Sequence, residues 1–301
     1  MAGVIAPPVQ PRPPGARGEW AHRIDGVLIE GDDRPDSALL APFFEGYDRA
    51  FVLPDEKETL EGFRACLALN DMAFPFAAWP MRELVLVARD GPDAPRLGGA
   101  NLFASLIAGR VAVALNYVYV DAGHRGRGLL RLMIDATVAA ARAYLGAPGA
   151  PVTLFIEQND PLRMSRESYA EDSAHSGLDQ IDRLGIWGRA GARLVDIDYV
   201  QPALSAGQAE DHSLAYAALR HDGDFVAGPF LAAHLTGFFG ISVLKGRDPA
   251  AVPTARRQIE SAAARERVAL LPLLPLAERL KAGPRPAGAD SLVALARAGA
   301  A

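Results

Sequence analysis

The sequence predicts a mixed α/β fold, an α+β arrangement in which helices flank a mostly antiparallel sheet with one central parallel pair of strands. Two observations carry this prediction. Residues 83–107 contain two β-rich runs separated by the turn Asp90-Gly91-Pro92, which is typical of antiparallel strands. Residues 111–120 then form a strand that leads through a glycine turn and a helix into another strand, and such a crossover makes the two strands parallel.

Length and composition limit the class of protein. The chain of 301 residues is long enough for one large domain or two modest ones. Its residues are 50% hydrophobic and 22% charged, a balance that excludes wholesale disorder. The net charge of -5 disfavours nonspecific binding to a nucleic acid backbone. Cys66 has no partner for an internal disulfide, and no Cys/His spacing is typical of zinc, so we expect a cytoplasmic protein without a structural metal.

No membrane segment is expected. The longest strongly apolar tract near the C-terminus, Val268 to Ala277, is interrupted by Pro272 and Pro275, and a membrane span needs about 20 residues. Residues 1–18 are rich in Pro and Gly and lack the basic head and apolar core of a signal peptide. We therefore expect a flexible tail at the N-terminus.

The elements before the glycine turn follow from spacing and composition. Two short helices are predicted between residues 37 and 71, because Leu60, Phe63 and Leu67 recur at helical spacing. Three strands follow as a meander, over residues 83–88, 97–107 and 111–120. The last strand is apolar on both faces except for Asn116, which is typical of a strand covered on both sides. We expect it at the centre of the sheet.

The elements after the turn complete the sheet and then become helical. Apolar residues recur on one face of a helix over residues 130–145, which ends at Gly146. The parallel strand, a helix and two further strands are predicted over residues 151–156, 177–189, 194–200 and 213–220. Later helices are predicted from Pro229, over Thr254 to Leu271 and over Ser291 to Arg297. The chain thus divides into a tail (1–18), an α/β domain (19–222) and a helical C-terminal extension (223–301).

The turn after the central strand has the composition of an anion site. Residues 123–131 read GHRGRGLLR and lead directly into a helix. Glycines let a ligand approach the backbone closely, and the first N–H groups of the helix point one way with the positive end of its dipole. Arg125, Arg127 and Arg131 add positive charge. Neither a Walker loop nor a G-x-G-x-x-G order is present, so the site is suited to a pyrophosphate outside those two classes.

This turn resembles the acetyl-CoA motif of the GNAT superfamily of N-acetyltransferases, which is Arg or Gln, two residues, Gly, one residue, then Gly or Ala. Arg125 and Gly128 match the motif, whereas Leu130 stands at its last small position. Val120-Asp121-Ala122 is similar to the family's lead-in, with alanine in place of proline. The resemblance extends over residues 24–222. It implies a GNAT-like sheet whose central parallel strands splay apart.

The resemblance also implies a cofactor, acetyl-CoA or another acyl-CoA, whose pantetheine arm runs along the exposed edge of the central strand. Val118 and Val120 would supply backbone groups to that arm. Asn159, just after the next strand, occupies a place where the family often has a cofactor contact. The turn would hold the diphosphate through Arg125, Gly126, Arg127, Gly128 and Leu130.

The catalytic groups depart from the family pattern. Trp187 stands where many members have a tyrosine that protonates the leaving thiolate, and an indole N–H is not a usable general acid. The central strand also lacks the carboxylate base that the family often carries there. Glu157, at the end of the parallel strand, is the candidate base, and Tyr117 is a second candidate catalytic residue. The alternatives are a solvated or helix-capping Glu157 and a Tyr117 that only packs on the sheet.

These features together predict an N-acyltransferase, in the first instance an N-acetyltransferase. It would move an acyl group from acyl-CoA to an amine of a small molecule or a protein, by direct attack in a ternary complex. The extra polar loop between Asn159 and Trp187 is a candidate cover for the acceptor. Two alternatives stay open. One is a non-catalytic acyl-CoA-binding regulator, and the other is an interaction module that forms a homodimer through the C-terminal helices.

Overall fold

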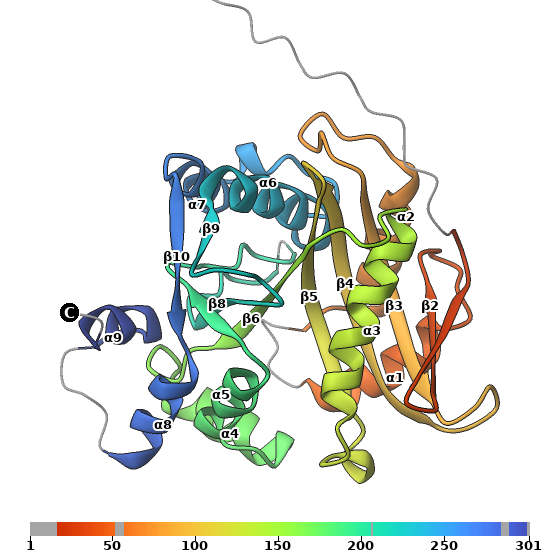
Figure 1. Ribbon diagram of the computed structural model, residues 1–301, viewed down its shortest axis with the longest axis horizontal. Helices are drawn as coiled ribbons and strands as arrows, with labels where there is room; N and C mark the ends of the chain where they lie inside the picture. Colours follow the sequence, from red (N-terminus) through yellow and green to blue (C-terminus); the bar gives the residue numbers. More distant parts are fainter. Residues whose placement is uncertain (1–16, 52–56, 206, 284–288, 300–301) are drawn as a thin grey trace, which may run out of the picture.

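A single 10-stranded sheet runs through the part of the chain that the computed structural model describes, residues 17–51, 57–205, 207–283 and 289–299 (Figure 1). The strands are β1 (Trp20–Ile24), β2 (Val27–Asp32), β3 (Met81–Arg89), β4 (Arg96–Ile107), β5 (Arg110–Val120), β6 (Val152–Asn159), β7 (Arg193–Val195), β8 (Leu214–Leu219), β9 (Phe225–Ala227) and β10 (Arg267–Pro272). Their order in the sheet is β1-β2-β3-β4-β5-β6-β8-β7-β10-β9.

The described strand pairs are antiparallel except for the central one, β5 with β6, which is parallel. The mixed, mostly antiparallel sheet predicted from the sequence is therefore confirmed. The parallel pair arises as predicted, because α3 crosses from the end of β5 to the start of β6.

Helices cover both faces of the sheet. They are α1 (Leu40–Ala50), α2 (Leu60–Ala68), α3 (Leu129–Tyr144), α4 (Arg166–Ser176), α5 (Gln180–Arg189), α6 (Gly228–Phe238), α7 (Pro253–Ala263), α8 (Leu274–Ala282) and α9 (Leu292–Gly299). On one face α3, α5, α8 and α9 pack into one apolar cluster. On the other face α1 and α2 cover the β3–β5 half, and α6 and α7 cover the middle and the β10 side.

The central elements form where the sequence places them. β5 is buried from Val111 to Leu115, with side chains alternating between the two apolar clusters. Gly128 precedes α3 in the left-handed region, and Gly146, at φ +61°, follows its end, so both boundaries use glycines in a conformation that other residues rarely adopt.

Three expectations about individual elements are wrong. A helix over Thr254 to Leu271 is not found, because α7 ends at Ala263 and Arg267–Pro272 forms β10, which joins the sheet beside β7 and β9. The strand expected over residues 194–200 is only β7, Arg193–Val195. The polar loop before α5 contains a helix, α4. The chain beyond residue 223 is therefore not wholly helical.

The β1–β2 hairpin has no counterpart in the expected elements. Its strands are joined by Asp25 and Gly26, both with positive φ, and an Asp-Gly pair is a strong hairpin signal. The tail expected over residues 1–18 falls, up to residue 16, outside the described residues.

Asp160 connects the end of β6 to the C-terminal part of the chain. Its carboxylate is buried and accepts hydrogen bonds from the backbone N–H of Leu162 at 2.9 Å and of Leu292, the first residue of α9, at 2.7 Å. We expect Asp160→Ala to lower the free energy of unfolding by about 2 kcal/mol, because it leaves two backbone donors without their acceptor. Urea unfolding measures this, with the exposed Asp93→Ala as control, and equal stabilities would contradict it.

Candidate active site

The two central strands separate before they end. Backbone pairing of β5 with β6 covers Val111–Ala114 and Val152–Phe155. Beyond this point β5 continues beside β4 as far as Val120, while β6 continues beside β8 as far as Asn159. The sheet therefore opens into a fork between the two strands, which Figure 1 shows with β6 leaving β5 on one side. This fork is the splay that the resemblance implied.

The backbone of β5 presents hydrogen-bonding groups to the fork. The N–H of Asp121 donates to the carbonyl of Leu97, which continues the ladder with β4. In an antiparallel pair, successive residues of one strand direct their backbone N–H and C=O groups to opposite edges. Tyr119 therefore also bonds toward β4, whereas Val118 and Val120 direct their N–H and C=O groups toward the fork. Val118 and Val120 thus lie at the edge of β5 that borders the fork, and a contact with a cofactor stays a prediction.

The glycine turn lies at the open end of the fork and leads into α3. Gly126 and Gly128 have φ values of +75° and +79°, and a Cβ at either would meet nothing within 4 Å. Gly128 is the N-cap of α3, and no side chain caps the helix. The first-turn N–H groups, those of Leu129, Leu130 and Arg131, therefore have no side-chain acceptor among the described residues. This arrangement is suited to an anion.

The basic side chains of the turn are exposed. Arg125 donates to the carbonyl of Ser176 at 2.6 Å, and Arg127 lies 3.2 Å from the Nδ1 atom of His124. Both guanidinium groups are thus at the surface beside the uncapped helix start, with no carboxylate among these contacts. Positive charge and N–H groups without a side-chain acceptor therefore lie close together at this turn, and the binding of a diphosphate there stays a prediction.

Helix α4 contacts the turn from the other side. Its His175 lies 2.7 Å from the backbone oxygen of Arg49 at the end of α1, and its Ser176 carbonyl accepts from Arg125. The extra segment between β6 and α5 therefore lies against both α1 and the glycine turn. Whether it covers an acceptor stays a prediction.

Asn159 is placed within a buried polar group rather than at the surface. Its amide nitrogen lies 3.4 Å from Asp172 Oδ2 and 3.3 Å from Gln180 Oε1, and Arg183 pairs with Asp172 at 2.8 Å. These contacts join the end of β6 to α4 and α5. They give Asn159 a structural role, and a contact with a cofactor stays a prediction.

A small cavity lies inside the fork on the face that carries α1, α2 and α6. Its volume is about 20 Å³, which is room for about one water molecule. Asn116 and Tyr117 of β5 line it together with Glu157 of β6 and Glu83 of β3. A register shift against β4 between Asn101 and Phe103 marks a bulge in β5, so Asn116 and Tyr117 both face the cavity although they are consecutive.

Glu157 is the carboxylate at the fork. It follows the last residue of β6 that pairs with β5 by two positions, and it accepts a short hydrogen bond from the hydroxyl of Tyr199. Burial raises the pKa of Glu157 to about 7, the Tyr199 hydrogen bond opposes this rise, and the charge of Asp211 adds to it. A carboxylate that exchanges its proton near pH 7 inside a cavity is suited to general base catalysis.

Tyr117 lines the same cavity, surrounded by aromatic rings. Its ring centroid lies 4.7 Å from that of Tyr47 and 5.2 Å from that of Phe51, both edge-on. Burial, followed by the negative charge of neighbouring groups, raises the pKa of Tyr117 well above its usual value. Its hydroxyl therefore stays protonated and can only donate or accept a hydrogen bond. A catalytic role for Tyr117 stays a prediction.

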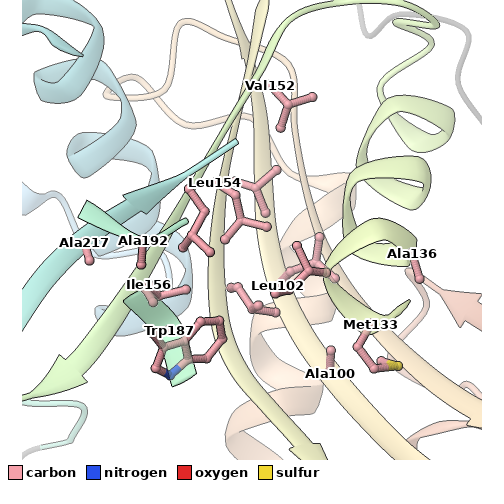
Figure 2. Packing of buried hydrophobic residues seen from close by; sticks show 14 of the residues in the cluster. Ala100, Leu102, Met133, Ala136, Val152, Leu154, Ile156, Trp187, Ala192 and Ala217 are labelled. Atoms are coloured by element: carbon pink, nitrogen blue, oxygen red, sulfur yellow. The ribbon is translucent and has the colours of Figure 1, made fainter. Parts of the chain in front are cut away.

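Trp187 lies in the apolar core on the opposite face. Figure 2 shows its ring beside Ile156 and near Leu154 and Leu102, and it is only 6% exposed. The indole packs under the fork as part of the cluster that holds α5 to the sheet. Its position agrees with the conclusion from the sequence that Trp187 is not a general acid.

Sequence reasoning missed five polar residues around this cavity: Glu58, Glu83, Asn101, Gln201 and Ser242. Glu83 directly precedes the apolar residues 84–88 of β3, and this was the one signal that pointed to it. The other residues come from segments far apart in the chain. Within the described residues no group of three or more His, Cys, Asp or Glu side chains is placed to hold a metal ion. No helix of the described chain is long and apolar enough to cross a membrane.

Comparison with known proteins finds similarity only at the level of structure. No family model and no curated protein sequence matches the chain. A protein from Bacteroides thetaiotaomicron described as a GNAT-family acetyltransferase is similar over 68% of this chain and 91% of its own, at 12% identity and a TM-score of 0.43.

Two alanine acetyltransferases of ribosomal proteins are also similar. The S18 enzyme from Escherichia coli matches 64% of this chain and 92% of its own, at 14% identity and a TM-score of 0.33. The S5 enzyme from Vibrio fischeri matches 67% and 97%, at 14% identity and a TM-score of 0.35. The predicted sheet, mostly antiparallel with one central parallel pair, is seen in the strand pairing of this chain itself.

Proposed function

We propose that the protein is an acyl-CoA-dependent N-acyltransferase, in the first instance an N-acetyltransferase, that acts on an amine by direct attack in a ternary complex. One observation carries the proposal. The strands β5 and β6 separate, an uncapped helix start follows the end of β5, and a cavity with a near-neutral carboxyl, Glu157, lies between the two strands. An anionic acyl donor and a basic acceptor would meet there.

The residues present fit the donor. The N–H groups of Leu129 and Leu130 and the side chains of Arg125 and Arg127 would hold the diphosphate. The fork-facing backbone groups of Val118 and Val120 would bind the pantetheine arm, which carries amides of its own. When bound, acyl-CoA supplies a thioester carbonyl, whose C–S bond breaks as an amide forms and whose sulfur leaves with a proton.

Residues of this chain would then deprotonate the acceptor amine and stabilise its attack on the thioester. Glu157 takes the proton that an ammonium must lose before its nitrogen can attack a carbonyl. Tyr199 holds the Glu157 carboxyl in place through its hydroxyl. Backbone N–H groups of β5 beyond the bulge at Asn116 would stabilise the negative charge that develops on the carbonyl oxygen. Trp187 is buried elsewhere, so solvent is the proton source for the departing thiol.

Thiol release separates this enzyme from a non-catalytic acyl-CoA-binding regulator. With acetyl-CoA and a panel of amines, an enzyme releases CoA thiol in proportion to amide product. A regulator binds acetyl-CoA without release. Binding without amine-dependent thiol release for any amine would contradict the proposed function.

Removing the Tyr199 hydroxyl is expected to shift the pH dependence of kcat. The hydrogen bond from Tyr199 lowers the pKa of Glu157, so Tyr199→Phe should raise it. Because the base acts when deprotonated, the fall in kcat at low pH should move to higher pH by about one unit. The buried Tyr144, whose hydroxyl donates to Gly18 far from the cavity, gives the matched control Tyr144→Phe. An unchanged profile in Tyr199→Phe would contradict the assignment of Glu157 as base.

A further inference from the structure

Glu83 is the second carboxyl of the cavity, and its position is tightly fixed. It is 1% exposed and accepts from the amide nitrogens of Asn101 at 2.8 Å and Asn116 at 3.0 Å, and from the hydroxyl of Ser242 at 2.8 Å. Burial raises the pKa of Glu83 to about 8 although these three hydrogen bonds act against the rise. A nearby cation would stabilise the ionised form of such a carboxyl and lower its pKa.

Asn116 supplies an oxygen that lacks a donor. Its amide nitrogen donates to Glu83 and, at 2.9 Å, to the side-chain oxygen of Asn101. Both partners are acceptors, so the amide cannot be turned around without opposing oxygen to oxygen. The Oδ1 atom of Asn116 is buried and has no hydrogen-bond partner among the described residues. A ligand with an N–H group would satisfy it.

The cavity is lined by carboxyl groups and by no basic side chain of the described residues. Of the described residues that line it, Glu58, Glu83 and Glu157 are acidic, and none is Lys, Arg or His. An ammonium already lies at the rim, where Lys245 Nζ is 2.7 Å from Glu58 Oε2 and 2.7 Å from the carbonyl of Leu204. The rim thus shows how this protein binds an ammonium, with a carboxylate and a carbonyl oxygen together.

The shape of the site restricts the acceptor further. Glu58 and Leu204 also line an open groove of about 950 Å³ on the outside, between α2 and the segment at Lys245. The groove is wide, whereas the cavity of about 20 Å³ admits only a thin end of a molecule. A primary ammonium has three N–H donors, and Glu83, Asn116 Oδ1 and Glu157 offer acceptors from three strands.

We propose that the acceptor is an unbranched aliphatic primary amine that enters as an ammonium, and that Glu83 and Asn116 are the residues that select it. The inference rests on the proposed function. Glu157 takes one proton from the ammonium, and a nitrogen–carbon bond to the acyl carbon then forms. The nitrogen releases its second proton to water as the thioester C–S bond breaks. The thiolate takes up a proton from water. A free diamine and a lysine side chain of a peptide present the same chemistry.

The pH dependence of acceptor binding follows from the groups that face Glu83. These are Glu58 and Lys245 at the rim, Cys66 on α2, and Tyr117 and Glu157 across the cavity. Because only the ionised Glu83 attracts an ammonium fully, the acceptor KM should fall as the pH rises from about 7 to about 9. Glu83→Gln should remove this fall, a change that a purely structural residue would not produce.

The first test needs no variant. Butylamine, butan-1-ol and cyclohexylamine are titrated by calorimetry into the full chain saturated with CoA. We expect saturable heat with butylamine and none with the alcohol or the ring-substituted amine at the same concentration. Thiol release with acetyl-CoA then compares 1,4-diaminobutane with a lysine-containing peptide, and the faster one identifies the source of the amine.

The second test uses Glu83→Gln, with Glu266→Gln as the control because Glu266 is 89% exposed and far from the cavity in the sheet order. Glu83→Gln should raise the acceptor KM by about 10-fold or more, with kcat and the heat of acetyl-CoA binding nearly unchanged. If acetyl-CoA binds but butan-1-ol or cyclohexylamine serves as well as butylamine, the inference is overturned and the proposed function stands. If acetyl-CoA gives no saturable heat, both fail.

Discussion

Glu157→Gln is expected to lower kcat for acyl transfer by about 100-fold to 10,000-fold, which is the usual contribution of a general base. Gln keeps the size of the side chain and can still accept from Tyr199, so the fold should survive. The heat of acetyl-CoA binding should be unchanged, because Glu157 lies on the acceptor side of the fork. Thiol release under saturating acetyl-CoA and amine measures the effect.

The pH profile gives this prediction a second readout. Burial raises the pKa of Glu157 to about 7, so the protonated and inactive form dominates below this value. In the unmodified protein kcat should fall about tenfold per pH unit below pH 7 and level off above it. Glu157→Gln should show low activity without this limb, and Glu266→Gln should behave as the unmodified protein does. A Glu157→Gln variant with full activity would rule out Glu157 as the general base.

Gly128→Ala is expected to raise the dissociation constant of acetyl-CoA by about 10-fold or more. A Cβ at Gly128 would stand in open space beside the uncapped first turn of α3, where the diphosphate is proposed to lie. The left-handed conformation at φ +79° also costs an alanine about 1 kcal/mol. The substitution is therefore expected to lower the stability of the fold and to obstruct the proposed diphosphate site.

Gly26→Ala separates the two effects. Gly26 has φ +85° and likewise meets nothing within 4 Å, but it lies in the β1–β2 hairpin. Both variants should lose similar stability by thermal unfolding, whereas only Gly128→Ala should lose affinity for acetyl-CoA by calorimetry. Equal affinities of the two variants for acetyl-CoA would contradict a diphosphate site at the start of α3.

The centre of the fold and the glycine turn were accessible to sequence reasoning because their signals are local. A strand buried on both faces reads as an apolar run, and glycines at positive φ precede a helix with regular apolar spacing. Glu157 was accessible because it directly follows the β-rich run at residues 152–156. Each of these features depends on fewer than about twenty consecutive residues, which is the range over which hydrophobic periodicity predicts secondary structure.

The acceptor cavity was not accessible, because its residues come together only through tertiary structure. Glu83 on β3, Asn116 on β5 and Ser242 after α6 are far apart in sequence, and a bulge decides that Asn116 faces inward. β10 was missed for a different reason. Arg265, Glu266 and Arg267 continue the charged pattern of α7, so the change to a short strand leaves little signal.

Calorimetric titration with acetyl-CoA, compared with S-acetylpantetheine, tests the central claim most directly. The claim is that the turn from Arg125 to Leu130 binds the diphosphate of an acyl-CoA. It predicts one saturable site for acetyl-CoA and binding weaker by about 100-fold for the analogue, which lacks the diphosphate and the adenosine 3′-phosphate attached to it. No saturable heat with acetyl-CoA, or equal affinity for the two compounds, would contradict it.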